Sequence, residues 1–215
     1  GMIEAAAAEL ERLDDAAGDF EGALRRARLK LAAGGKDAAL RELRAIPADR
    51  ADADARVEAA ALALAAGDAP VAERFAGAVR PAAGAGELLQ PGLYRTRWGG
   101  CEFCTMALLE DRRGNPAEAR RLRAALAEFL DRMERQGHAW HAIHYLRGTL
   151  AAQEGDFEAA LAALERAVAT GWRRGWWMRL DPSLAPLRTD PRFTQLLATL
   201  DASAEQARQR LQTAR

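Results

Sequence analysis

The chain lacks an excess of charge of either sign, since its 31 basic residues balance its 31 acidic residues. A general binder of nucleic acid needs a basic excess to neutralise phosphates, so we expect no direct contact with nucleic acid. No apolar run approaches the ~20 residues that a membrane-spanning helix needs, so we expect this segment to make no membrane contact. The N-terminus alternates charge with alanine and does not read as a signal peptide. A cytoplasmic location is favoured, with the periplasm as the alternative if the sequence was taken from a membrane-anchored protein.

Residue types that carry nucleophilic or metal chemistry are also scarce. The only serines are Ser183 and Ser203, and neither lies on a strand-to-helix elbow of the kind that exposes a nucleophile. No glycine-rich loop follows a predicted strand to hold a phosphate. Two cysteines in 215 residues exclude a scaffold held by several disulfides. We therefore expect a protein that is not an enzyme, with no catalytic residues and no cofactor.

The chain is 49% hydrophobic but only 6% aromatic, and much of its apolar share is alanine, which favours closely packed helices. The clearest helix is GDFEAALAALERAV, residues 155–168. Gly155 suits the end of the preceding helix, and Asp156 suits the N-cap of the next. Spacings of three, four and seven place one apolar stripe on a helix face, formed by Phe157, Ala160, Leu161, Leu164, Ala167 and Val168. In the preceding predicted helix, 139–153, Gly148 would allow close approach of the two backbones.

A Gly-x-x-x-x-Ala pattern opens four predicted helices, at Gly34, Gly67, Gly114 and Gly155. The first two copies are 33 residues apart, close to the ~34-residue tetratricopeptide period, and the later spacings are 47 and 41. A small residue lies about seven positions before each glycine: Ala27, Ala60, Ala107 and Gly148. The pattern resembles the tetratricopeptide repeat (TPR) family, although Ala23, Arg56 and His144 replace an aromatic at three of the four first-helix starts. This resemblance implies an all-α fold, a right-handed α-α superhelix or TPR-like solenoid with a C-terminal capping helix.

The expected organisation is an N-terminal helix at 1–17, repeats over 18–170, and a tail with a capping helix at 171–215. A long glycine-rich insert interrupts the repeats at 80–100, and Asn115 and Glu118 read as a reciprocal cap of the helix that begins at Pro116. The tail resembles the end of the C-terminal TPR module in large bacterial multidomain regulators, namely winged-helix regulators, cyclases and kinases. The matching segments are Trp176-Trp177, Asp181-Pro182, Pro186-Leu187-Arg188 and Asp190 to Phe193.

The resemblance implies a scaffold or signalling module that binds a peptide or partner helix in its concave face without chemistry. The groove residues that it implies are Arg28, Val57, Ala61, Leu64, Cys101, Cys104, Leu108, Arg112, Tyr145, Thr149 and Gln153. Because this surface is mixed, an amphipathic partner fits it better than a purely acidic one. A homodimer through the insert at 80–100 is a further hypothesis.

Two local clusters allow other interpretations. Cys101 and Cys104 are three residues apart on a predicted helix, and all three histidines lie at His138, His141 and His144. Together they suggest a metal- or redox-responsive sensor, while the simpler interpretation is two small groove residues and a packed histidine cluster, with no metal. The tryptophans of 172–177 alternate with arginines, which could clamp an anionic ligand, or the rings could be buried beneath the last helix while the arginines stay solvated.

Overall fold

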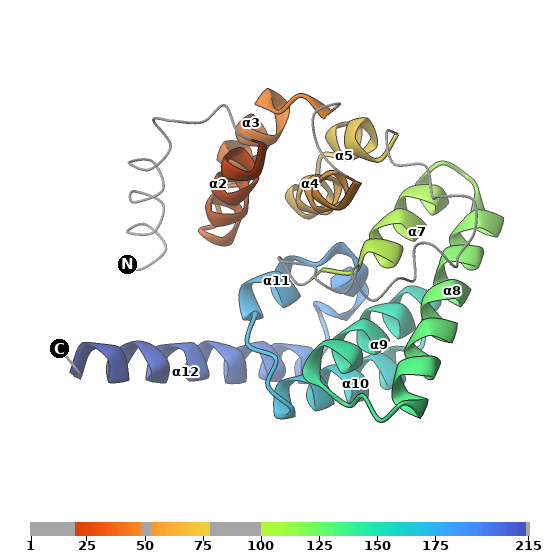
Figure 1. Cartoon of the computed structure of the whole chain (residues 1–215). Coiled ribbons are helices and arrows are strands. Elements are labelled where there is room, and N and C mark those ends of the chain that lie inside the picture. The colour runs from red at the N-terminus through yellow and green to blue at the C-terminus, as the bar shows by residue number, and fades with distance from the viewer. Residues whose placement is uncertain (1–19, 49–52, 78–99, 214–215) are drawn as a thin grey trace. The chain divides into compact units, whose positions relative to one another are not determined.

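The computed structural model describes residues 20–48, 53–77 and 100–213, and every regular element in them is a helix (Figure 1). The chain divides into two compact units, residues 1–109 and 110–215. The predicted N-terminal helix at 1–17 and nearly all of the insert at 80–100 lie outside the described residues. Within these residues, no helix combines the length and the apolar character that a membrane crossing requires. Because the regular elements of the described residues are all helices, the all-α prediction is confirmed.

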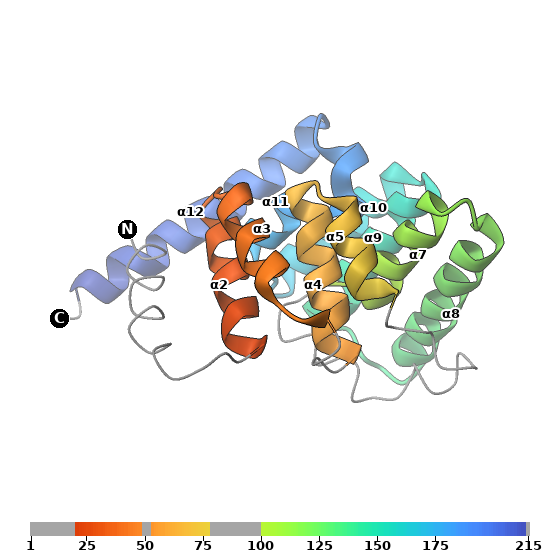
Figure 2. The same ribbon diagram turned by 90° about the horizontal axis from the view of Figure 1, so that it is seen from above.

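The first unit contains two antiparallel helix pairs, α2 (Phe20–Ala32) with α3 (Lys36–Ala45) and α4 (Ala53–Ala66) with α5 (Ala69–Ala76). Figure 2 shows the four helices side by side, and α4 packs against both helices of the preceding pair. Each pair turns at a glycine with positive φ, 85° at Gly34 and 95° at Gly67. Side chains with a Cβ rarely adopt this conformation, which explains why glycine recurs there. At the second turn the carboxylate of Asp68 accepts the amide of Val71 at 2.9 Å and caps α5.

The second unit is built on α8 (Pro116–Arg135), α9 (His141–Glu154) and α10 (Phe157–Ala169), with α9 and α10 in the most extensive contact. The predicted junction between them is confirmed. Gly155 ends α9 with φ 83°, and the Asp156 carboxylate accepts the Ala159 amide at 3.0 Å. A Cβ on Gly148 would lie 2.7 Å from Cγ of Leu164, so glycine sets how closely these two helices approach.

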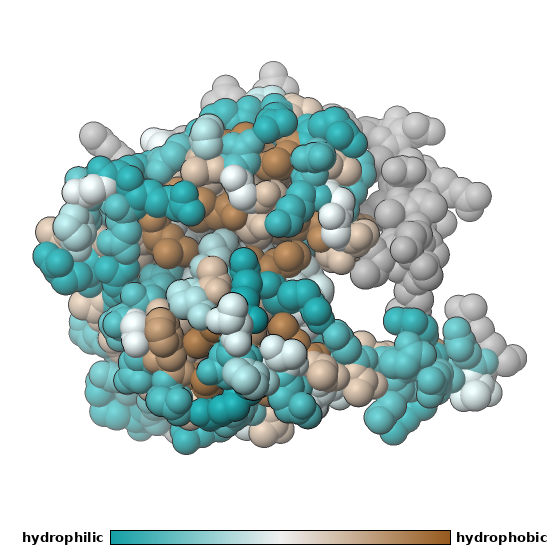
Figure 3. Space-filling view, turned by 180° about the vertical axis from the view of Figure 1, so that it is seen from behind, coloured by the Kyte–Doolittle hydropathy of each residue, from teal (hydrophilic) through white to brown (hydrophobic). Residues whose placement is uncertain are grey.

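The tail contains more helix than its sequence predicted. Two short elements, α11 (Gly175–Leu180) and the 3₁₀ helix η3 (Pro182–Leu187), precede the last helix, α12 (Pro191–Thr213). As predicted, Asp190 caps α12, because its carboxylate accepts the Arg192 amide at 2.7 Å. Only the first half of α12 is packed, against α10 and α11. Its second half projects beyond them and is mainly hydrophilic on the face seen in Figure 3.

Two local predictions are wrong. Phe157 was placed in the buried stripe of α10, but its side chain is 43% exposed, since the first residue of the helix lies beyond the contact with α9. Asn115 precedes α8 but makes no capping bond with its side chain. Its amide instead donates to Glu110 at 2.9 Å, and Glu118 pairs with Arg121 rather than completing a reciprocal cap.

We predict that Gly148→Ala lowers the free energy of unfolding by about 1–3 kcal/mol, because the new methyl would overlap Leu164. The same change at an exposed helix interior would raise it by about 0.5–1 kcal/mol, so the two cases differ in sign. Urea denaturation followed by circular dichroism measures the effect.

The matched control is the same substitution in a Leu164→Ala background, which removes the overlapping carbons. There Gly148→Ala should cost clearly less. An equal cost in both backgrounds would show that contact with Leu164 is not what requires glycine at this position.

Candidate functional site

The eleven predicted groove residues belong to four helices or lie directly before one. Arg28 is on α2, and Val57, Ala61 and Leu64 are on α4. Cys101 precedes α7 (Glu102–Arg112), which carries Cys104, Leu108 and Arg112, while Tyr145, Thr149 and Gln153 are on α9. In the first unit, Arg28 faces α4, where its guanidinium donates to the buried carboxylate of Glu58, with Nε 2.9 Å from Oε1. The structure thus brings Arg28 beside the turn of α4 that contains Val57. The three α4 residues of the set are buried.

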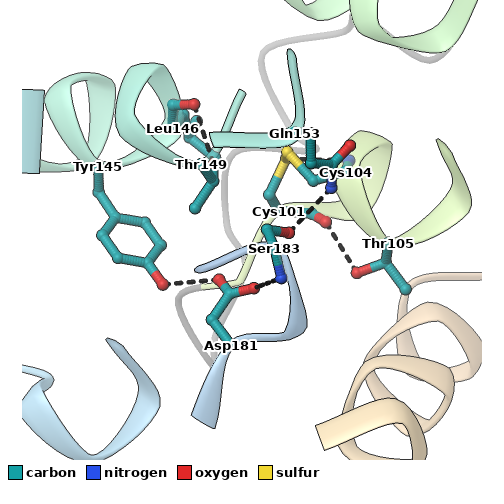
Figure 4. The surroundings of a disulfide bond; sticks show 9 residues. All are labelled: Cys101, Cys104, Thr105, Tyr145, Leu146, Thr149, Gln153, Asp181 and Ser183. Atoms are coloured by element: carbon teal, nitrogen blue, oxygen red, sulfur yellow. Dashed lines mark hydrogen bonds between the residues drawn. A yellow bond between two sulfur atoms is a disulfide. The ribbon is translucent and has the colours of Figure 1, made fainter. Parts of the chain in front are cut away.

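Cys101 and Cys104 are joined by a disulfide at the start of α7 (Figure 4). Cys101 precedes the first helical residue, and its carbonyl accepts the Thr105 amide at 2.9 Å, as the carbonyl of an N-cap residue does. Its sulfur accepts the Cys104 amide at 3.1 Å. Further along the helix, Leu108 is half-buried and Arg112 is exposed. The prediction of two small thiols lining a groove did not anticipate this bond.

In the second unit the tail covers the face of α9 that was predicted to line the groove. Tyr145 is fully buried, and its ring stacks on Trp172 with centroids 3.8 Å apart. The Tyr145 hydroxyl donates to the Asp181 carboxylate at 2.6 Å, as Figure 4 shows. One helical turn from Thr149, which is also buried, the Gln153 amide donates to the Ser183 hydroxyl at 2.9 Å. This part of the predicted face is therefore occupied by the chain itself.

Asp181 is a buried carboxyl, 2% exposed, that sits between α11 and η3. Burial raises its pKa above the ordinary value, against the lowering effect of hydrogen bonds from Tyr145 and Ser183. The pKa of Tyr145 is raised well above its usual value, mainly by burial and then by the adjacent Asp181. The pair is arranged to hold the tail against α9, with both groups in hydrogen bonds that limit the cost of burying them.

The three histidines do not form one cluster of ligands. His138 is exposed and His144 is half-buried, while the His141 ring lies edge-on to Trp172 with centroids 6.1 Å apart. Burial lowers the pKa of His141, and the nearby Arg174 and Arg173 lower it further. In the described part of the chain, no group of three or more histidine, cysteine or acidic side chains could hold a metal ion.

The tryptophans and arginines of the tail separate as the simpler interpretation expected. Trp172 and Trp177 are buried, while Arg173 and Arg174 are exposed. Trp172 packs on the Tyr145 ring of α9. This placement favours a structural role for the rings over an aromatic clamp for an anion.

Glu102 is the first residue of α7, and its side-chain carboxyl has a strongly raised pKa. Burial raises its pKa from 4.5 to about 8, and the negative charge of Asp54 at the start of α4 adds to the effect. The carboxyl is therefore mainly protonated at neutral pH, although an ionised carboxylate is usually favoured in the first turn of a helix.

Comparison of the chain with family models, with curated proteins and with solved structures finds no match. The site must therefore be interpreted from its own residues. Sequence reasoning noted Asp181 only as part of an Asp-Pro pair and gave no role to its buried carboxyl. Its signal in the sequence is the run of apolar residues around it, in which a lone acidic side chain must find donors if it is buried.

Replacing Tyr145 with phenylalanine tests the link between the tail and α9. We predict that Tyr145→Phe lowers the free energy of unfolding by about 1.5–3 kcal/mol, because Asp181 loses a donor while it remains buried. In an Asp181→Ala background the same change should cost much less, since the hydroxyl has already lost its acceptor. Urea denaturation of the four proteins gives the coupling energy, and a coupling near zero would contradict the assignment.

The raised pKa of Glu102 predicts a pH-dependent stability. The folded state holds the proton up to about pH 8, whereas the unfolded chain releases it near 4.5, so the stability that Glu102 provides is full in acid and lost as the pH rises to about 8. Glu102→Gln should remove this dependence, so its unfolding free energy relative to wild type should rise between pH 5 and 8.

The matched control for this change is Glu118→Gln. The pKa of Glu118 is lowered, chiefly by its hydrogen bond to Arg121, so its contribution is constant over the same pH range and is lost only in acid. Denaturation curves from pH 4 to 9 compare the variants. Parallel stability profiles for wild type and Glu102→Gln would show that Glu102 titrates normally in the folded protein.

Proposed function

We propose that this chain is a non-catalytic protein-interaction module that binds a peptide or partner helix on a face formed by successive first helices of TPR-like pairs. The repetition in the first unit is the observation that carries the proposal. The pairs α2–α3 and α4–α5 turn at left-handed glycines 33 residues apart, and α4 packs on both helices of the pair before it. Stacked helix pairs of this kind commonly provide extended binding surfaces.

The ion pair between Arg28 and Glu58 supports this assignment, because it joins the first helices of the two pairs. The proposal is also consistent with a regulatory or signalling role, of the kind that the resemblance to C-terminal modules of bacterial regulators implies. Closure of α9 by the tail limits the accessible part of the implied face. Among the predicted groove residues of the second unit, Arg112 is the exposed one. Arg112 is the last residue of α7.

The proposed partner is an amphipathic polypeptide with acidic side chains on one edge. An exposed arginine would attract such a segment mainly through its charge, so the contribution of a single residue is modest. The apolar side of the partner would have to contact half-buried side chains of the same face, such as Leu108.

Photo-crosslinking at position 112 tests the proposal. A photoreactive phenylalanine derivative at Arg112 should capture a defined polypeptide from a lysate of the source cells. The same photoreactive amino acid placed at position 120 should not capture it, because Arg120 is an exposed arginine of α8 outside the implied face. Once the captured polypeptide is purified, Arg112→Glu should weaken its binding about three- to tenfold, and Arg120→Glu should leave it unchanged.

Both arginines are exposed, so the two charge reversals are matched in size and in their small expected effect on folding. Capture of the same polypeptides at both positions would contradict the proposal. So would an affinity that Arg112→Glu and Arg120→Glu change equally.

A further inference from the structure

The disulfide closes a Cys-x-x-Cys segment at the first turn of α7, with Cα atoms 5.1 Å apart. In this arrangement the first cysteine occupies the N-cap and the second lies three residues into the helix. The spacing alone occurs in both metal sites and redox pairs, but here the two sulfurs are bonded to each other. Bonded cysteines in this segment favour redox chemistry over metal binding.

The environments of the two sulfurs differ. The amide of Cys104 donates to Cys101 Sγ at 3.1 Å, in the position where the oxygen of a serine or aspartate N-cap usually accepts. In the dithiol state the same amide and the positive end of the helix would stabilise a thiolate at Cys101. Cys104 is itself part of the first helical turn, so its sulfur does not hold the N-cap position. Cys101 is therefore the better nucleophile of the pair at neutral pH.

The adjacent carboxyl does not oppose this assignment. Glu102 follows Cys101 directly, and an ionised side chain there would disfavour a neighbouring thiolate. Its pKa is raised to about 8, so at pH 7 it is mainly neutral.

Both cysteines are buried, with 3% exposure at Cys101 and 1% at Cys104. A reagent therefore needs a local opening to reach the sulfurs, and the first turn of α7, which contains them, is the segment most directly involved. Helix ends open more readily than helix interiors, and such local opening needs less free energy than global unfolding. Exchange through this opening would be slow but would not require the whole protein to unfold.

We propose that Cys101 and Cys104 form a redox-active pair that exchanges with low-molecular-weight thiols and disulfides of the glutathione class. In the oxidising direction, the Cys101 thiolate attacks one sulfur of glutathione disulfide, a mixed disulfide forms at Cys101, and one glutathione leaves as its thiolate. The Cys104 thiolate then attacks Cys101 Sγ and releases the second glutathione. Two protein thiols and one glutathione disulfide thus become one protein disulfide and two glutathione molecules, with protons exchanged with water. Reduction reverses these steps.

The wild-type protein gives the first test. The folded, full-length chain is equilibrated in mixtures of reduced and oxidised glutathione, quenched in acid, alkylated and weighed by mass spectrometry. Dithiol and disulfide forms should interconvert in native buffer, and the exchange rate should depend much less steeply on urea than global unfolding does. Exchange that follows the urea dependence of global unfolding, or no exchange until the protein unfolds, would overturn the proposal.

The single variants Cys104→Ser and Cys101→Ser give the second test, because each retains one thiol. At pH 6.5, glutathione disulfide should modify Cys101 in Cys104→Ser at least about tenfold faster than it modifies Cys104 in Cys101→Ser. Equal rates in two variants with wild-type circular dichroism would refute the role of the N-cap sulfur. The wild-type exchange measurement needs no substitution and decides the proposal if either variant fails to fold.

Discussion

The hydrogen bond from Tyr145 to Asp181 determines how the second unit is built. It draws the tail onto α9 and, together with the stacking of Tyr145 on Trp172, buries a face that a tetratricopeptide pattern would leave for a partner. A buried carboxyl without such donors would cost several kcal/mol, so the tail and α9 depend on each other. Helix α12 follows directly from η3 in the chain, and its capped start gives the α9–α10 pair a further packed neighbour.

The predicted binding face is covered by different groups in the two units. In the first unit the face is crossed by an ion pair between the partly buried Arg28 and the buried carboxylate of Glu58. In the second unit it is covered by buried aromatic rings and a buried carboxyl, which a partner could replace only by displacing the tail. Binding at Tyr145 or Thr149 would cost the free energy of displacing the tail, so binding at exposed positions such as Arg112 is favoured.

The sequence predicted the junction between α9 and α10 correctly because its signals are local. Gly155 and Asp156 act on the neighbouring turn alone, and Gly148 is small in any context. The candidate site was less predictable, because burial of Tyr145 depends on Asp181, which lies 36 residues away in the chain. Phe157 shows the same limit on a smaller scale: its spacing fits the apolar stripe, but only the packing partner decides where that stripe ends.

The proposed redox pair lies at the start of α7, and Arg112 of the proposed binding face lies at the end of the same helix. Cys104 and Arg112 are eight residues apart, about 12 Å along a straight helix at 1.5 Å per residue. Reduction of the disulfide removes a bond within the first turn of α7. In that turn the backbone amide of Cys104 already donates to Cys101 Sγ. The later turns keep their own hydrogen bonds, so a change at Cys101 need not reach Arg112. A dependence of partner binding on thiol state would therefore require the partner to contact the first turn of α7 directly.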